Sequence, residues 1–169
     1  ATMCDTFGPR FTGSRNLEDA IDWCLAEMKK DGFQNVRGEE VIVPRWVRGN
    51  ESVELLLPRR RALPMLGLGG SVGTPPEGIT ADVLVVSGFD DLKNRAAEAK
   101  GKIVLFNVPF TEYRETVIVR TQGAIHASRA GAVASLIRSV GPFSMQTPHT
   151  GGMSYADGVK KIPHAALSL

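Results

Sequence analysis

Residues 101–140, "GKIVLFNVPFTEYRETVIVRTQGAIHASRAGAVASLIRSV", decide the fold of this chain. A β-branched and leucine-rich run begins after Gly101 and predicts a buried strand. The segment from 115 to 130 predicts a helix that ends at Gly131, and a second buried strand follows directly in "AVASLIRSV". Small residues where the helix ends allow helix and sheet to approach closely. We therefore expect a strand, helix, strand unit at the centre of the fold.

The segments on either side of this unit predict further short strands. Pro, Gly and charged turns separate apolar runs at intervals of roughly 10–15 residues. One short helix is expected in "DDLKNRAAEAKG", and a long loop over residues 141–161 has little periodicity. The fold class predicted is therefore mixed α/β (α+β). The expected strands are "EEVIVP" (39–44), "SVELLLP" (52–58), "ALPMLGL" (62–68), "ADVLVVS" (81–87) and "IPHAALSL" (162–169).

An amphipathic helix is predicted near the N-terminus. Apolar residues recur there at a spacing of three to four, and charged residues occupy the other face. Ser14 or Asn16 can cap its start, and Gly32 supplies a left-handed stop. This helix needs a surface on which to pack. Its apolar positions are Leu17, Ala20, Ile21, Cys24, Leu25 and Met28.

Composition limits the function classes that are open. The chain is 43% apolar and 22% charged, so it can bury a core, and its net charge of +2 does not indicate a nucleic-acid partner. No apolar stretch reaches the roughly 18 residues that a membrane span requires.

The two cysteines, Cys4 and Cys24, are expected as buried free thiols. Asn50-Glu51-Ser52 is an acceptor sequence for N-glycosylation. The abrupt start and end indicate a fragment.

The stretch "GGSVG", residues 69–73, matches the G-x-S-x-G pattern of serine hydrolases. A nucleophile elbow needs a helix directly after the serine. Thr74 is followed by Pro75 and Pro76, and a residue before proline is pushed out of the helical region. We therefore interpret Ser71 as a loop residue, and no catalytic residue is assigned.

Metal ligation has no support in the spacing of the histidines. His126, His149 and His164 lie far apart, and no H-x-x-x-H or C-x-x-C occurs. His126 is expected on a solvated helix face and His164 at a strand end. Only His149, in the long loop beside Thr150, has a setting that invites a ligand. No metal ligand is assigned in this segment.

Several stretches together resemble the zinc aminopeptidase/glutamate carboxypeptidase family, in collinear order over nearly the whole chain. The resemblance implies that residues 1–40 open the catalytic domain and that residues 41–169 form a protease-associated domain, a β-sandwich or swivelling β/β/α fold. These stretches are "GPRFTGS", "LGLGGSVGTPPEGITADVLVVS", "EAKGKIVLFN", "RTQGAIHASRAGAVASLIRSV", "PHTGG" and "DGVKKIP".

The same resemblance implies a function for the parent protein. Members of the family hold two zinc ions with residues downstream of this chain, so no metal or catalytic position is carried over. The resemblance further implies small peptide substrates, a homodimer, and a secreted or lysosomal compartment. By position, the 141–160 loop with His149 and Tyr155 is expected to face substrate. The alternative is a stand-alone protease-associated module that binds a partner peptide without catalysis.

Overall fold

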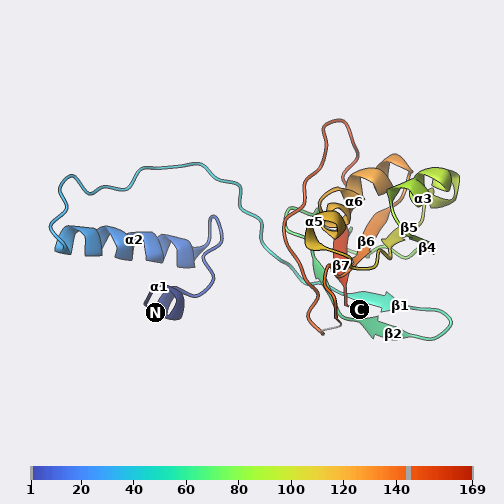
Figure 1. Cartoon of the computed structure of the whole chain (residues 1–169), viewed down its shortest axis with the longest axis horizontal. Helices are drawn as coiled ribbons and strands as arrows, with labels where there is room; N and C mark the ends of the chain where they lie inside the picture. The colour runs from blue at the N-terminus through green and yellow to red at the C-terminus, as the bar shows by residue number, and fades with distance from the viewer. Residues whose placement is uncertain (1, 144–145, 169) are drawn as a thin grey trace. The chain divides into compact units, whose positions relative to one another are not determined.

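The C-terminal part of the chain folds around a five-stranded sheet (Figure 1). The computed structural model describes residues 2–143 and 146–168. The strand order is β3-β7-β6-β5-β4; β4 to β7 run parallel, and β3 pairs antiparallel with β7 at one edge. The strands are β3 (Met65–Gly67), β4 (Val83–Val86), β5 (Ile103–Phe106), β6 (Ala134–Arg138) and β7 (His164–Leu167). The mixed α/β class predicted from the sequence is confirmed.

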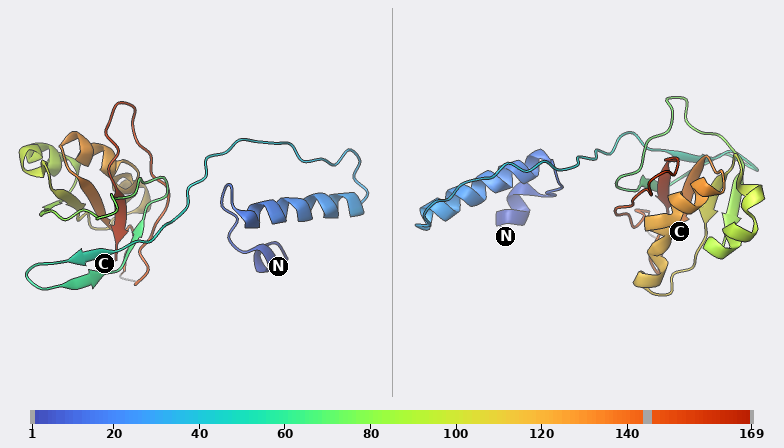
Figure 2. Two further views of the ribbon diagram at one scale, coloured as in Figure 1. Left: turned by 180° about the vertical axis from the view of Figure 1, so that it is seen from behind. Right: turned by 90° about the horizontal axis from the view of Figure 1, so that it is seen from above.

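Four helices connect the parallel strands, and Figures 1 and 2 show them lying together against the sheet. They are α3 (Phe89–Asn94), α4 (Ala96–Ala99), α5 (Tyr113–Thr116) and α6 (Ile118–Arg129). The central strand, helix, strand unit is thus confirmed as β5, α5 with α6, and β6. The helical part begins earlier than residue 115, as a separate first turn. Next to it, the Thr111 N–H donates to Thr116 Oγ1 and the Thr111 hydroxyl donates to Glu115 Oε2.

The core lies between the sheet and these helices. Alternate residues of β4 to β6 point towards the helices and are buried, whereas Val83 and Val85 on the opposite face are 45% and 48% exposed. This alternation follows from the period of two along a strand. Burying a side chain as large as Phe106 stabilises the fold by about 1.5–3 kcal/mol. The large apolar residues of β4 to β6 in this core are Leu84, Val86, Val104, Phe106 and Ile137.

A separate hairpin precedes the main sheet. Strand β1 (Val53–Leu55) pairs antiparallel with β2 (Arg61–Leu63). The strand expected over residues 39–44 is absent, and this prediction was wrong. Val41 and Ile42 are 72% and 97% exposed, and the segment pairs with no strand of the described chain. Strand propensity alone does not stabilise an extended segment that has no neighbour to receive its hydrogen bonds.

The N-terminal part contains α1 (Thr2–Phe7) and α2 (Arg15–Lys30). Ser14 is the N-cap of α2: its hydroxyl oxygen accepts a hydrogen bond from the Leu17 backbone N–H at 3.2 Å. Gly32 follows the helix with φ +86°, as the stop signal predicts. The chain divides into two compact units, Ala1–Val47 and Arg48–Leu169.

The cysteines are free but not buried as expected. Cys4 is exposed and Cys24 is partly exposed. Cys24 lies on the apolar side of α2, which is only partly covered: Ile21 and Met28 are 41% and 43% exposed. Among the helices of residues 2–143 and 146–168, none is both long and apolar enough to cross a bilayer.

Candidate functional site

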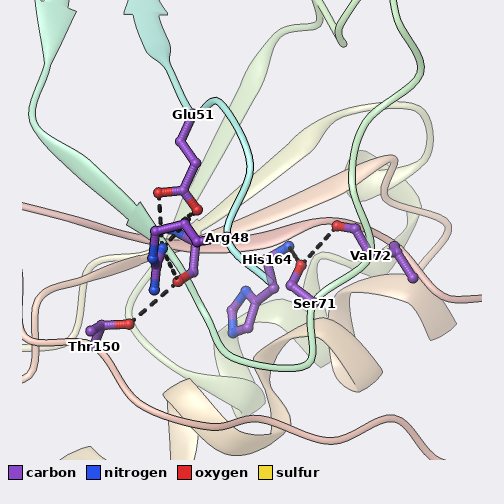
Figure 3. Close-up of polar contacts among 7 residues, drawn as sticks. Arg48, Glu51, Ser71, Val72, Thr150 and His164 are labelled. Carbon is purple, nitrogen blue, oxygen red and sulfur yellow. Dashed lines mark hydrogen bonds and ion pairs between the residues drawn. The ribbon is translucent and has the colours of Figure 1, made fainter. Parts of the chain in front are cut away.

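Ser71 lies in the glycine-rich turn after β3 (Figure 3). Its hydroxyl oxygen accepts a hydrogen bond from the His164 backbone N–H at 2.8 Å, and the hydroxyl donates to the Val72 carbonyl at 2.9 Å. The chain then continues through Pro75 and Pro76, and its next helix is α3. The helix that a nucleophile elbow needs is therefore missing. The interpretation of Ser71 as a loop residue is confirmed.

The His164 side chain is a buried part of the core. It is 1% exposed, with Nδ1 3.2 Å from the Ser135 carbonyl oxygen and Nε2 3.3 and 3.2 Å from those of Val119 and Arg120. Burial lowers the pKa of His164, although the three carbonyl oxygens act in the opposite direction. A Cβ on Gly123 would lie 2.9 Å from the ring, so α6 needs glycine there to approach β7.

Side chains close the outer edge of β3 at Gly67 (Figure 3). Arg48 Nη1 and Thr150 Oγ1 donate to the Gly67 carbonyl oxygen at 2.8 and 3.3 Å, and Glu51 Oε1 accepts from the Gly67 N–H at 3.0 Å. Arg48 and Glu51 also form an ion pair at 2.7 Å. These contacts satisfy backbone groups that an edge strand otherwise exposes. Through Thr150 they also hold one part of the long loop.

Tyr155 fixes the long loop at a second point. Its hydroxyl donates to the Ile162 carbonyl oxygen at 2.7 Å and accepts from the Val72 N–H at 3.0 Å. The ring is half-buried and packs against the core. Tyr155 therefore joins the loop to the glycine-rich turn.

His149 is an exposed residue of this loop, and it lies against a buried arginine. Arg120 Nη1 is 3.3 Å from His149 Nδ1 and donates to the Thr150 carbonyl oxygen at 3.3 Å. A guanidinium can only donate, so Nδ1 accepts and the ring hydrogen is placed on Nε2. The Tyr113 ring lies 5.7 Å from Arg120 Cζ and 5.7 Å from the His149 ring.

The charge of Arg120 is not compensated within the described chain. The residue is 9% exposed, its Nε has no hydrogen-bond partner, and no carboxylate of residues 2–143 and 146–168 forms an ion pair with it. Buried cations are usually paired, because removing a charge from water is costly. The cluster of Arg120, His149 and Tyr113 therefore places positive charge beside the exposed His149 side chain.

Sequence reasoning identified His149 but missed Arg120. A signal was present, because Thr116, Arg120, Gly123 and Ala127 recur at the spacing of one helix face, and the last two of these are small residues suited to a helix that packs closely. A charged residue on such a face indicates either a buried partner or a ligand. The partner, His149, is 29 positions away, so spacing along the chain could not reveal the pair.

The remaining candidate positions lie apart from this cluster. Asn50 is exposed in the segment before β1. His126 is half-buried against Phe89 instead of lying on a solvated helix face, with ring centroids 3.9 Å apart. Within the described ranges, no three His, Cys, Asp or Glu side chains are grouped so that they could hold a metal ion.

The fold is similar to that of known peptidases. A crystallised peptidase M28 precursor from Shewanella amazonensis matches with a TM-score of 0.88 and 35% identity, over 98% of this chain and 39% of that chain. A zinc aminopeptidase from Bacillus subtilis shares the fold alone, with a TM-score of 0.52 and 23% identity over 99% of this chain and 36% of that one. The fold of this chain is therefore similar to that of the matching part of an M28 peptidase precursor.

The particular protein that the sequence resembles is carboxypeptidase Q. Human carboxypeptidase Q is 53% identical over 169 residues, which is 100% of this chain and 36% of the human protein. The chain thus spans about a third of the length of the curated relatives it matches, and the resemblance seen in the sequence is confirmed along all of it. No family model matches the chain.

Proposed function

We propose that the chain is the non-catalytic N-terminal and protease-associated portion of a zinc exopeptidase that hydrolyses dipeptides or small peptides. In this proposal residues 1–40 open the catalytic domain and residues 41–169 are the protease-associated domain. The similarity to carboxypeptidase Q supports a peptidase-related role, and the 36% coverage of that relative supports a larger parent.

The zinc ions of this proposal belong to the rest of the parent. The histidines of this chain do not fit a metal: His164 is enclosed by carbonyl oxygens, and the other two lie in separate settings. In the parent, zinc would supply Lewis-acid chemistry for peptide hydrolysis. This segment would contribute a wall of the active-site cleft and support for folding.

We propose that the long loop over residues 141–160 faces the substrate, with His149 as the contacting side chain and Tyr155 as the loop's anchor. The single observation that carries this proposal is the uncompensated charge of Arg120 beside exposed His149. A small peptide has a free C-terminal carboxylate. A carboxylate is the planar acceptor that a guanidinium binds best. The site would therefore recognise that end of the substrate.

Substitution of Arg120 in the full-length parent tests this role. Arg120→Gln is expected to raise KM about 10- to 100-fold for a dipeptide with a free carboxylate, which corresponds to one lost charge-assisted hydrogen bond of about 1.5–3 kcal/mol. The same dipeptide as its amide should be affected little, because it has no charge to lose. KM for both peptides is the measurement, and Arg59→Gln, which removes an exposed charge on the hairpin, is the control.

A structural role for Arg120 would give a different result. If the guanidinium only holds the Thr150 carbonyl, Arg120→Gln should weaken activity on acid and amide alike. His149→Ala provides a second test, because removing an exposed side chain leaves the core intact. Equal KM values for the acid in His149→Ala and the unmodified parent would contradict a contact with substrate.

We further propose that the parent is a secreted or lysosomal homodimeric glycoprotein modified at Asn50. The exposure of Asn50 in its acceptor sequence supports this assignment. Zinc content, mass in solution, and mass before and after removal of N-glycans check these parts in the purified parent. A monomer without glycan at Asn50 would contradict them.

A further inference from the structure

A small groove lies between α3, α4 and the C-terminal end of α6. Its volume is about 250 Å³. The apolar part of its lining comes from Leu92, Ala96 and Ala130. The groove is open to solvent and lies two turns along α6 from Arg120, so it is separate from the proposed substrate site. The proposed function does not use it.

One wall of the groove is formed by aromatic rings. The rings of Phe89 and His126 stack at 3.9 Å with an interplanar angle of 11°. The Phe89 ring also packs edge to face against the Phe106 ring, with the ring centroids 5.4 Å apart. Burial, and then the charge of Arg129, lower the pKa of His126, so this wall is uncharged at neutral pH. The groove can therefore accept an apolar side chain.

Three charged residues stand on the rim of the groove. Asp90 and Lys93 come from α3, one turn apart, and Arg129 comes from α6. No hydrogen bond or ion pair within the described ranges engages these three side chains, whereas neighbouring Arg95 is paired with both Asp91 and Glu98. The rim therefore offers two cations and one carboxylate beside an apolar pocket.

We propose that this groove binds a free α-amino acid with an apolar side chain. Lys93 and Arg129 would bind its carboxylate, Asp90 would bind its ammonium group, and the side chain would lie on Phe89. The pairing of charges is the reason for choosing an amino acid over a simple organic acid, because an acid would leave Asp90 as a repulsive neighbour. The inference goes beyond the proposed function and does not depend on it.

Titration of the 169-residue chain with three probes tests this proposal by NMR. L-Phenylalanine is expected to bind at least tenfold tighter than N-acetyl-L-phenylalanine, which has no ammonium group, and than L-phenylalaninamide, which has no carboxylate. Shifts should map to α3 and the end of α6. Arg129→Gln should weaken the binding of L-phenylalanine about tenfold, because one charge-assisted contact is lost. Lys160→Gln, an exposed charge outside the groove, should have no effect.

A second variant isolates the role of the Asp90 carboxylate. Asp90→Asn should remove the preference for L-phenylalanine over its N-acetyl derivative, and it leaves the apolar lining unchanged. Equal binding of all three probes, shifts elsewhere in the chain, or no saturable binding would each overturn the proposal. Because these measurements need no hydrolysis, they can fail or succeed independently of the Arg120 experiment.

Discussion

At the scale of single residues, the surroundings of a side chain decide its role more than the motif around it. Ser71 fits a hydrolase pattern, yet its hydroxyl orders the backbone at His164 and Val72. His164 is likewise a core residue whose ring is enclosed by carbonyl oxygens. Pro75 and Pro76, which follow Thr74, predicted the loop role of Ser71 from the sequence. The enclosure of His164 depends on strand β6, which pairs with β7, and on helix α6, which packs against the His164 ring.

The lowered pKa of His164 predicts how stability depends on pH. The folded state binds its proton less readily than the unfolded state, whose histidine has the ordinary pKa of 6.5. Stability from this group is therefore fully present above pH 6.5 and is lost as pH falls from there through the folded pKa. His126 acts in the same direction.

Urea unfolding between pH 7.5 and pH 5 measures this effect. The free energy of unfolding is expected to fall over this range, and to fall less in His164→Gln after correction for its lower stability at pH 7.5. Asp91 and Glu98 have pKa values lowered from 3.8 and 4.5, so the effect of these two carboxylates appears at lower pH. An unchanged pH slope in the variant would contradict the assignment.

At the scale of elements, both edges of the five-stranded sheet are closed by arginine side chains. Arg48 occupies the edge at β3, and Arg95 Nη1 donates to the Val85 carbonyl oxygen of β4 at 3.0 Å. Glu98 and Asp91 hold Arg95 in place. An open edge strand with exposed valines would be a template for another chain, and these arginines obstruct that pairing.

Arg95→Gln is therefore expected to increase self-association of the chain. The shorter neutral side chain cannot reach both the Val85 carbonyl and the carboxylates, so the edge of β4 becomes available. Light scattering after size-exclusion chromatography measures the change at several protein concentrations. Arg60→Gln, which breaks an exposed pair with Glu54 on the hairpin, is the matched control. Identical mass distributions for the two variants would show that Arg95 does not protect the edge.

At the scale of the whole molecule, the chain consists of two compact units, and the boundary between them falls in a segment without regular structure. Residues 38–50 are exposed throughout and pair with no strand of the described chain. Arg45 lies in this segment, whereas Arg120 and Lys102 lie within the second unit. The backbone of this segment is exposed and belongs to no helix or strand, so it is open to local attack.

Limited trypsin digestion of the 169-residue chain should therefore cut first after Arg37 or Arg45. The larger product would contain the second unit and should unfold cooperatively, because its core is contained within that unit. Mass spectrometry of early time points identifies the sites. Early cleavage after Lys102 or Arg120 would contradict the division into units.

The sequence by itself determined the local elements and the class of fold. Hydrophobic period, the Ser14 cap and the glycine stops predict the main helices and the strand, helix, strand unit because these signals act within a few residues. The expected strand at 39–44 failed for the complementary reason. Its propensity was correct, but a strand exists only where another strand receives its hydrogen bonds.

Only the tertiary structure decided the site. Arg120 meets His149, and Tyr155 meets Val72, across 29 and 83 positions of the chain. The groove is also formed by residues of α3 and α6 that no spacing connects. Burial and charge compensation depend on such long-range neighbours, so a side chain's identity is visible in the sequence while its partner is not.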